Sequence, residues 1–421
     1  MELKLTASDS DLLAGESGEG ARLAMSILVR VAEVQEAEQF IPVKSAHIDS
    51  SLYMGDATLD YAEHLVRLGA EVAVPSTLNV AGVDPHGWKD WAVPPKWAEK
   101  AHRQMVAYQS MGCIPSWTCA PYQTDEARPG FGDQIAWGES SAVVFANSVL
   151  GARTERYPDL LDICAAITGR VPFVGLHLTE NRAGKILFRC HGIKSSLLAS
   201  DELYPVLGHL VGKIAGNRVV VLDNLDVEPS EDQLKAFGAA TASSGSVALF
   251  HWVGITPEAP SLNDAVQGRS PEEVHEVTMD DLRASRDELS ISKGEQIDMV
   301  VLGSPHFSLE EFKVLVPLLE GRKRHSDVRF LITTGRGVKL IAQEIGLLDS
   351  IHSFGGEVTV DTCILTSPML PNEIKTLMTN SAKYAYYTPG ILGRDMFFGS
   401  TKDCVESAVL GRIVRDDSLW Y

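Results

Sequence analysis

The pattern of hydrophobic and polar residues changes near residue 200. Beyond that point, short uninterrupted apolar runs alternate with amphipathic segments. Apolar runs without alternation are typical of strands that are buried on both faces, as in parallel sheets. This half is therefore predicted to form one or two doubly wound α/β units. The expected strands are 219–223, 247–253, 299–303 and 328–332, and the expected helices are 231–241, 309–319 and one ending near 345.

The first 200 residues combine helices with long loops. Residues 6–36 carry capping Ser and Asp side chains before an apolar stretch, which predicts a helix. Strands are expected at 40–47 and 71–75, and a helix at 59–68 that Gly69 closes. A helix with very few charges is expected at about 142–150, and an uncharged helix is buried. Its polar members, such as Asn147, then need partners inside the protein.

A polar turn, Ser76-Thr77-Leu78-Asn79, follows the predicted strand 71–75 directly. Ligands of open α/β sheets bind at the carboxyl ends of strands. Ser76, Thr77 and Asn79 are therefore candidate ligand contacts. A turn that only caps the next element explains the same residues equally well.

Cysteines form the second candidate feature. Cys119 lies in the proline-rich segment 112–122, where two prolines favour a rigid loop. Cys363 and Cys404 have similar small, polar neighbours. Three thiolates from distant parts of a chain suit a metal or an iron–sulfur cluster with one open position. Simple packing is the alternative for each of them, because free cysteine is among the most buried residue types and no CxxC pair is present.

Composition narrows the classes of partner. The chain has 421 residues, enough for two or three domains, and a formal net charge of −19. Such an acidic surface repels phosphate backbones and anionic lipid, so neither nucleic acid nor a membrane is expected as a partner. The absence of signal-peptide features and the six cysteines indicate a reducing cytoplasm. No GxGxxG or GxxxxGK[ST] motif indicates a nucleotide cofactor.

Three further positions could bind an anion. Thr334-Gly335-Arg336-Gly337 stands at a predicted helix start. Ser381 and Lys383 alternate on one side of a predicted strand or extended loop, where Lys383 is either a surface lysine or an anion ligand. Arg153 suits a carboxylate through its fork, and a structural ion pair is the alternative.

Taken together, these motifs resemble the aconitase X family of the aconitase superfamily. The matching segments follow in order along nearly the whole chain. They are His47-Ile48-Asp49, Pro75-Ser76-Thr77-Leu78-Asn79, Thr118-Cys119-Ala120-Pro121-Tyr122, 139–154, 166–172, Gly303-Ser304-Pro305-His306-Phe307-Ser308, Asp361-Thr362-Cys363, 381–385 and the Cys404 segment.

The resemblance implies an α/β fold with aconitase-like catalytic domains 1–3, doubly wound sheets and no swivel domain. We expect a catalytic region at 1–200 with the TCAPY loop, a doubly wound region at 201–350, and a C-terminal segment at 351–421 that returns two cysteines to the site. A separate small swivel-domain subunit is expected as the partner. In the superfamily, a serine of the swivel domain acts as the base.

The resemblance also implies an iron-dependent dehydratase. Cys119, Cys363 and Cys404 would hold an iron–sulfur cluster (2Fe-2S or 4Fe-4S) or a mononuclear iron, with Cys113 as a competitor for the first position. The expected reaction is dehydration of cis-3-hydroxy-L-proline, a small carboxylate, to a pyrroline-2-carboxylate. Two alternatives stay open: 5-phosphomevalonate dehydration, with the phosphate at 334–337, and a non-catalytic subunit that keeps the fold.

Within that reaction, each candidate residue has an expected role. The catalytic candidates are His47, Asp49 and Lys383, and His306 is a further possible acid group. The expected substrate contacts are Ser76, Thr77, Asn79, Glu139, Arg153, Thr154 and Ser381.

Overall fold

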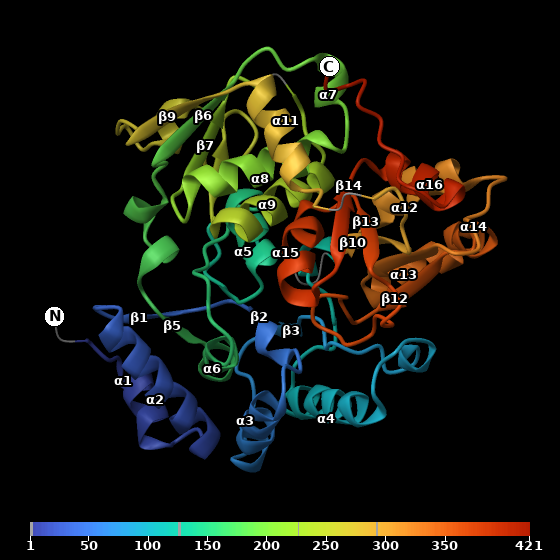
Figure 1. The fold of residues 1–421 in the computed structure, drawn as a ribbon. Helices are drawn as coiled ribbons and strands as arrows, with labels where there is room; N and C mark the ends of the chain where they lie inside the picture. The colour runs from blue at the N-terminus through green and yellow to red at the C-terminus, as the bar shows by residue number, and fades with distance from the viewer. Residues whose placement is uncertain (1–2, 125–127, 226, 292–293) are drawn as a thin grey trace.

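The computed structural model describes residues 3–124, 128–225, 227–291 and 294–421 and shows a mixed α/β fold (Figure 1). Three parallel sheets of three, four and five strands form the centres of three regions. This confirms the predicted α/β class with doubly wound sheets. Within the described ranges, no helix is long and apolar enough to cross a membrane.

The first region surrounds a small sheet with helices. Its strand order is β3-β2-β4, and β1 and β5 form a separate antiparallel pair. The elements are α1 (Ala7–Ala14), α2 (Glu19–Val34), β1 (Phe40–Pro42), β2 (Ala46–Ile48), α3 (Asp56–Arg67), β3 (Ser76–Leu78), α4 (Pro95–Ser110), β4 (Ala136–Trp137), α5 (Ser140–Ser148), α6 (Leu161–Thr168) and β5 (Arg170–Pro172).

The second region, at the top of Figure 1, is a four-stranded sheet in the order β8-β7-β6-β9. All three strand pairs are parallel. Its elements are β6 (Ile186–Cys190), α7 (Ser195–Leu198), α8 (Leu203–Ala215), β7 (Val220–Asp223), α9 (Glu231–Gly245), β8 (Phe250–Trp252), α10 (Leu262–Ala265), β9 (Glu273–Val277) and α11 (Met279–Glu288).

The third region is a five-stranded parallel sheet in the order β12-β11-β10-β13-β14, drawn in orange and red in Figure 1. Its strands come from both sides of residue 350. The elements are β10 (Met299–Phe307), α12 (Leu309–Leu319), β11 (Arg329–Thr334), α13 (Arg336–Glu344), α14 (Leu347–Phe354), β12 (Glu357–Val360), β13 (Thr376–Thr379), α15 (Ala382–Leu392), β14 (Asp395–Phe398) and α16 (Thr401–Leu410).

Strand β10 carries an irregularity that matters for the site. Its pairing with β11 shifts register between Leu302 and Phe307. Gly303 sits there at φ +99°, and a Cβ on it would lie 2.1 Å from the Thr333 carbonyl oxygen. Only glycine fits both constraints. The bulge lets the following residues, up to His306, leave the regular ladder.

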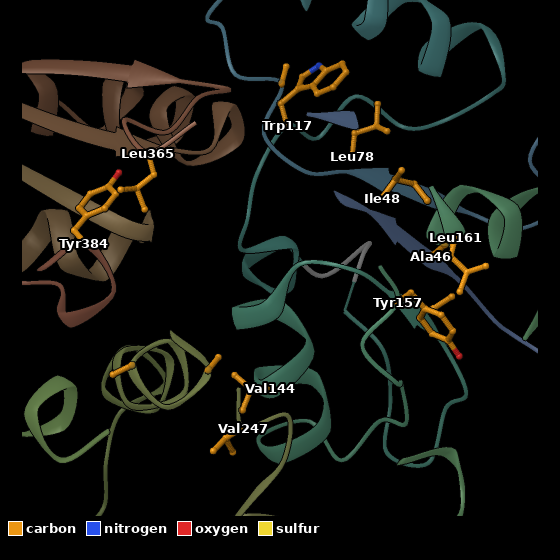
Figure 2. Packing of buried hydrophobic residues seen from close by; sticks show 14 of the residues in the cluster. Ala46, Ile48, Leu78, Trp117, Val144, Tyr157, Leu161, Val247, Leu365 and Tyr384 are labelled. Carbon is orange, nitrogen blue, oxygen red and sulfur yellow. The ribbon is translucent and has the colours of Figure 1, made fainter. Parts of the chain in front are cut away.

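The three regions share one continuous hydrophobic core (Figure 2). Ile48 of the first region, Val247 of the second and Tyr384 of the third all belong to it, and each is fully buried. Burying one such large apolar side chain stabilises a fold by roughly 1.5–3 kcal/mol. The core therefore holds the edges of the first and third sheets in a fixed relation, which a site shared between them requires.

Several predicted elements differ from the structure. The single helix expected at 6–36 is two helices, because Gly15 ends α1 in a left-handed conformation at φ +85°. The strand expected at 71–75 is wrong: β3 begins at Ser76, just after Pro75, which has no N–H to donate. The strand or extended loop expected around Lys383 is wrong as well. Ser381 caps α15 by accepting from the Tyr384 amide, so Lys383 lies in the first helical turn.

Candidate active site

The first and third sheets each change winding direction at one point. In the first sheet this point lies between β2 and β4, and in the third it lies between β10 and β13. Ligands of doubly wound sheets bind in the crevice at the carboxyl ends of such strands. Glu139 follows β4, and Lys383 follows β13. Their side chains meet, so the carboxyl edges of the two sheets adjoin at this point.

The Glu139–Lys383 ion pair joins the two regions. Lys383 Nζ lies 2.6 Å from Glu139 Oε1 and 3.1 Å from the Ser141 hydroxyl. The exposed fractions of the two charged side chains are 12% for Lys383 and 7% for Glu139. Burial alone would raise the pKa of Glu139, but the Lys383 ammonium and the hydrogen bonds from Ser141 and the Ala142 amide outweigh it and lower that pKa. Burial likewise opposes the charge on Lys383, but Glu139 raises the pKa of the ammonium. Both groups are therefore ionised at neutral pH.

Local sequence positions each member of the pair. Glu139 is the N-cap of α5, where its Oε2 accepts from the Ala142 amide at 2.7 Å. Ser381 is the N-cap of α15, and its hydroxyl donates to the Ser304 carbonyl. Capping side chains satisfy backbone donors that the helix leaves unpaired. Each cap therefore fixes one helix start and so aims one charged side chain.

His47 and Thr77 lie on neighbouring strands at the edge of the first sheet. His47 Nδ1 is 2.8 Å from the Thr77 hydroxyl, and His47 Nε2 makes no hydrogen bond within the described chain. Burial lowers the pKa of His47 to about 4, although the Glu139 carboxylate opposes that shift. The imidazole is therefore neutral at physiological pH and presents one ring nitrogen without a partner.

Asp49 and Asn79 follow the same two strands. Asn79 Nδ2 donates to the Asp49 carboxyl, while Asn79 Oδ1 is buried and has no partner among the described residues. Burial, reinforced by Glu139, Asp159 and Asp162, raises the pKa of Asp49 well above its ordinary value. This favours a protonated Asp49, which is a proton donor.

Cys119 and Cys363 border the ion pair. The His306 amide donates to Cys119 Sγ at 3.3 Å, and Cys363 Sγ donates to the Tyr384 hydroxyl at 3.6 Å. Burial raises the pKa of Cys119 to about 12, and both the Glu139 carboxylate and the Cys363 thiol add to the shift. Burial also raises the pKa of Cys363. The two thiols therefore lie in one buried environment beside Lys383, a cation that favours the thiolate of each.

Cys404 does not join these two thiols. It lies on α16, fully buried in a hydrophobic cluster of the third region with Val405, Ala408 and Met378. The charges that act on it are those of Asp403, Asp201 and Glu202, and not those of Glu139 or Lys383. Cys113 is buried in the main core, near Asp162. The packing of α16 against the sheet of the third region explains the position of Cys404.

The donor set can be tested against the expected iron–sulfur centre. In the part of the chain that the structure describes, no group of three or more His, Cys, Asp or Glu side chains is arranged to hold a metal ion. Cys119 and Cys363 lie close enough to influence each other's titration. The described side chains therefore show no site for a cluster held by three cysteines of this chain, and these two thiols are the candidate ligands.

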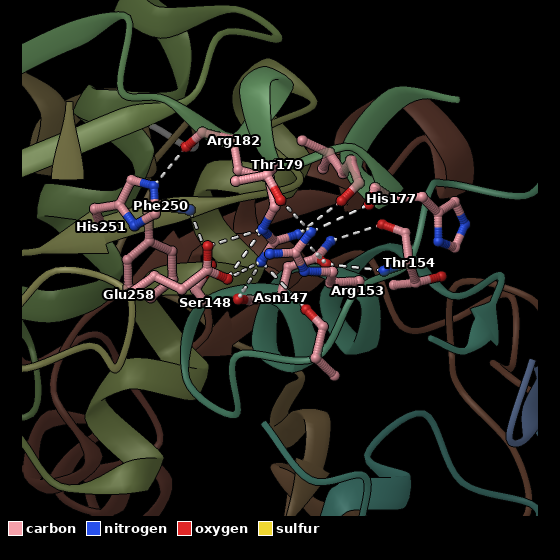
Figure 3. Close-up of polar contacts among 12 residues, drawn as sticks. Asn147, Ser148, Arg153, Thr154, His177, Thr179, Arg182, Phe250, His251 and Glu258 are labelled. Carbon is pink, nitrogen blue, oxygen red and sulfur yellow. Dashed lines mark hydrogen bonds and ion pairs between the residues drawn. The ribbon is translucent and has the colours of Figure 1, made fainter. Parts of the chain in front are cut away.

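Arg153 and Thr154 lie in a different network (Figure 3). Arg153 donates to the Thr179 hydroxyl at 2.7 Å and faces the buried Arg182, which pairs with Glu258. Thr154 is held by backbone groups: its hydroxyl accepts from the Trp137 amide and donates to the Glu155 carbonyl. Asn147, which the sequence predicts to need an internal partner, bonds to the Thr154 backbone on both sides of its amide. These residues connect the first and second regions, away from the ion pair.

The remaining candidates have local partners. Ser76 donates to the Val74 carbonyl at 2.8 Å. Arg336, in the segment expected to bind an anion, holds Asp361 through Nε at 2.7 Å and through Nη2 at 2.6 Å, so its fork is occupied by a carboxylate.

Sequence reasoning missed Ser141 and Tyr384 and named His306 only as an acid group. The available signal was position: each of the two missed residues follows a helix N-cap that leads into the site.

Comparisons with known proteins agree with this arrangement of three regions. Family models described as the aconitase X first, second and third domains match residues 2–180, 184–287 and 297–410. The divisions expected at residues 200 and 350 stay predictions.

Two relatives span nearly all of the chain. It is 46% identical over 412 residues to a cis-3-hydroxy-L-proline dehydratase of Pseudomonas aeruginosa, covering 97% of this chain and 70% of that protein. It is 36% identical over 410 residues to the phosphomevalonate dehydratase large subunit of Methanosarcina mazei, covering 97% and 98%. The crystal structure of Thermococcus kodakaraensis aconitase X (holo-form) superposes with a TM-score of 0.87 at 34% identity, covering 96% of this chain and all of that one.

Proposed function

Because this chain belongs to the aconitase X family, we propose that it is a hydro-lyase that dehydrates cis-3-hydroxy-L-proline to a pyrroline-2-carboxylate. The relatives described above are named dehydratases. The higher identity to the hydroxyproline enzymes, 46% and 42%, than to the phosphomevalonate enzymes supports this substrate. In the structure, the observation that carries the proposal is the buried Glu139–Lys383 pair at the joined carboxyl edges of two sheets.

The reaction needs three operations on the substrate. The carbon that bears the carboxylate loses a proton, the neighbouring carbon loses hydroxide, and proton and hydroxide leave as water. Hydroxide is a poor leaving group, so an acid must protonate it or a Lewis acid must take its charge.

Lys383 is assigned to the substrate carboxylate. An ammonium has three N–H donors, and two of them go to Glu139 and Ser141. The third is left for a carboxylate oxygen. Glu139 keeps Lys383 charged and fixes its direction, which lowers the entropy cost of holding the substrate.

Asp49 is assigned to the leaving hydroxyl. Burial raises its pKa and so favours the protonated form, and Asn79 holds the carboxyl in place. The unpartnered Asn79 Oδ1 is available to accept from the ring nitrogen of the substrate. His47, neutral and with Nε2 without a partner, is the remaining candidate for proton transfer inside this chain.

The base that takes the carbon-bound proton is proposed to lie on a small swivel-domain subunit. The relatives in Methanosarcina and other archaea are named large subunits, and the hydroxyproline enzymes extend beyond the matched region by about 30% of their length. A further domain or subunit would close the site and exclude water.

All six cysteines are free, which fits a reducing cytoplasm.

Cys119 and Cys363 are the proposed protein ligands of an iron centre. When bound, such a centre supplies a Lewis acid for the departing hydroxide. Cys404 is left out because its side chain lies in the core of the third region.

The test is anaerobic co-purification with the small subunit, followed by iron and sulfide analysis, an absorption spectrum and turnover of cis-3-hydroxy-L-proline. We expect iron and its visible bands to disappear in Cys119→Ser and Cys363→Ser. The matched controls Cys404→Ser and Cys164→Ser should keep both. A protein that stays colourless and inactive after reconstitution would refute the proposal.

Phosphomevalonate is the competing substrate. Its phosphate would need a cationic cradle, and the Arg336 fork in the segment 334–337 is already taken by Asp361. Parallel assays with the two substrates decide between them: a coloured protein that turns over only phosphomevalonate would reverse the assignment.

A further inference from the structure

His306 connects the two loops that carry Cys119 and Cys363. It is 1% exposed, and all four of its polar atoms make contacts. Its backbone amide donates to Cys119 Sγ at 3.3 Å, and its carbonyl accepts from Gln123 Nε2 at 3.0 Å. Nδ1 of the ring lies 3.0 Å from the Thr118 hydroxyl, and Nε2 lies 3.1 Å from the Thr362 carbonyl. Three of its contacts are therefore made to Cys119 or to the residues just before the two cysteines.

These contacts fix the tautomer of the ring. A carbonyl oxygen only accepts, so Nε2 carries the proton and donates to Thr362. Nδ1 is then an acceptor and receives the hydrogen of the Thr118 hydroxyl. The same Thr118 oxygen also accepts from the Ala120 amide at 3.1 Å, so this hydrogen bond joins the two residues on either side of Cys119. One neutral imidazole thus accepts a hydrogen bond from the Cys119 loop and donates one to the Cys363 loop at the same time.

Among the described residues, no disulfide or strand pairing joins the two loops. Cys119 belongs to the first region, and Cys363 follows β12 in the third. His306 reaches both because the bulge at Gly303 takes it out of the β10 ladder. The hydrogen bond between His306 Nδ1 and the Thr118 hydroxyl therefore ties the position of Thr118 to the third region.

We propose that His306 is a positioning residue that sets the separation and direction of the Cys119 and Cys363 thiols. It acts through Thr118, through the carbonyl of Thr362 and through its own amide, and it does not touch the substrate. Only the role of the two thiols as iron ligands rests on the proposed function. Their separation and direction are properties of the metal-free chain.

The test measures the thiol pair directly. Reduced, metal-free, full-length protein is treated with a series of bis-alkylating reagents of increasing span, and the Cys119–Cys363 cross-link is quantified by peptide mass spectrometry. Wild-type protein should favour one span, and Cys119→Ser or Cys363→Ser should abolish the product. In His306→Phe, loss of two buried hydrogen bonds should lower the cross-linking rate at that span roughly tenfold and broaden the preferred span.

Conservative and control variants separate positioning from general packing. A glutamine amide can occupy the Nε2 position and donate to Thr362, so His306→Gln should recover much of the rate. His251 is another buried histidine, and its Nε2 donates to the Arg182 carbonyl in the second region. His251→Phe should leave the cross-linking rate at the wild-type value.

The outcomes are distinct. Wild-type cross-linking in His306→Phe would overturn the proposal. If that variant does not fold, Thr118→Val removes the hydrogen bond to Nδ1 together with the one from the Ala120 amide, and an unchanged rate there would overturn the proposal equally. If the chain cross-links as expected but the enzyme reconstituted with iron and the small subunit does not dehydrate hydroxyproline, the proposed function is refuted and the role of His306 is left intact.

Discussion

Replacing Lys383 by methionine tests whether the Glu139–Lys383 pair holds the first and third regions together. The substitution keeps the length of the side chain and removes its charge. Glu139, only 7% exposed, then loses its only ion-pair partner in the described chain. It keeps the hydrogen bonds from Ser141 and the Ala142 amide. The variant therefore contains an uncompensated buried carboxylate in an otherwise unchanged site.

The size of the effect follows from the geometry. At 2.6 Å and an effective dielectric constant of about 20, the Coulomb attraction is about 6 kcal/mol, and the desolvation of two charges offsets part of it. Breaking a buried pair from one side costs about 3–5 kcal/mol. Replacing both partners by uncharged residues of similar volume is often nearly neutral. Lys383→Met should thus lose about 3–5 kcal/mol, and Lys383→Met with Glu139→Gln should recover most of it.

Thermal unfolding at several pH values is the assay. With about 2.1 cal/mol/K per residue and 421 residues, the unfolding entropy is about 0.9 kcal/mol/K, so the expected fall in Tm is about 3–6 °C. In the single variant, the unpaired Glu139 has a raised pKa when folded. Its deficit should therefore grow as the pH rises from 5 to 8 and shrink as Glu139 becomes protonated.

The double variant separates folding from catalysis. It should regain stability and stay inactive, since no ammonium is left for the substrate carboxylate. Equal instability of the single and double variants, or a deficit that does not change with pH, would show that the pair contributes packing only. Full activity in Lys383→Met would refute the assignment of Lys383 to the substrate.

Three further predictions concern stability. Arg182→Met should lower the free energy of unfolding in urea by about 3–5 kcal/mol, because it leaves Glu258 and several buried carbonyls without their donor. The control Arg30→Met, at a side chain that is 80% exposed, should lower it by less than about 1 kcal/mol. Equal losses in the two variants would contradict the reasoning. Burial, with Arg182 and Arg153 nearby, lowers the pKa of His177 to about 3. Because the unfolded imidazole takes up a proton below about pH 6.5, wild-type stability should fall by about 2 kcal/mol relative to His177→Gln between pH 7 and 5, and parallel pH profiles would refute this. Gly303→Ala should lower the Tm and the yield of folded protein, because its Cβ would clash with the Thr333 carbonyl. The control Gly337→Ala, where a Cβ meets nothing within 4 Å, should be neutral or stabilising by up to about 1 kcal/mol. A neutral Gly303→Ala would contradict the close approach of β10 to Thr333.

Local pattern predicted four strands and three helices of the second half of the chain, which correspond to β7, β8, β10, β11, α9, α12 and α13. The run 309–319 is helix α12, and 231–241 lies inside α9. Both begin with a serine that caps the helix and a Glu or Gln three residues later, a signal contained within four residues. Where the sequence reasoning failed, the deciding contact was distant. The residues 71–75 look like a strand, but β2 pairs with Ser76 to Leu78 instead.

The candidate site shows the same division. Glu139, Lys383, His47, Asp49 and Asn79 were all named from the sequence, because they follow predicted strands or stand in matching segments. Their pairing was not predictable: Glu139 and Lys383 are 244 residues apart and meet only because two sheets present their carboxyl edges to each other.

The sequence by itself determined the parallel α/β class, the buried character of α5 and the polar residues at strand ends, since each depends on neighbours a few positions away. Only the tertiary structure decided which of those residues share a site. Cys119 and Cys363 lie beside Lys383, while Cys404 points into a core and Arg153 into the Arg182 network. The direction of a side chain depends on which face of its helix or loop packs against the rest of the protein, and that face is set by contacts across the whole chain.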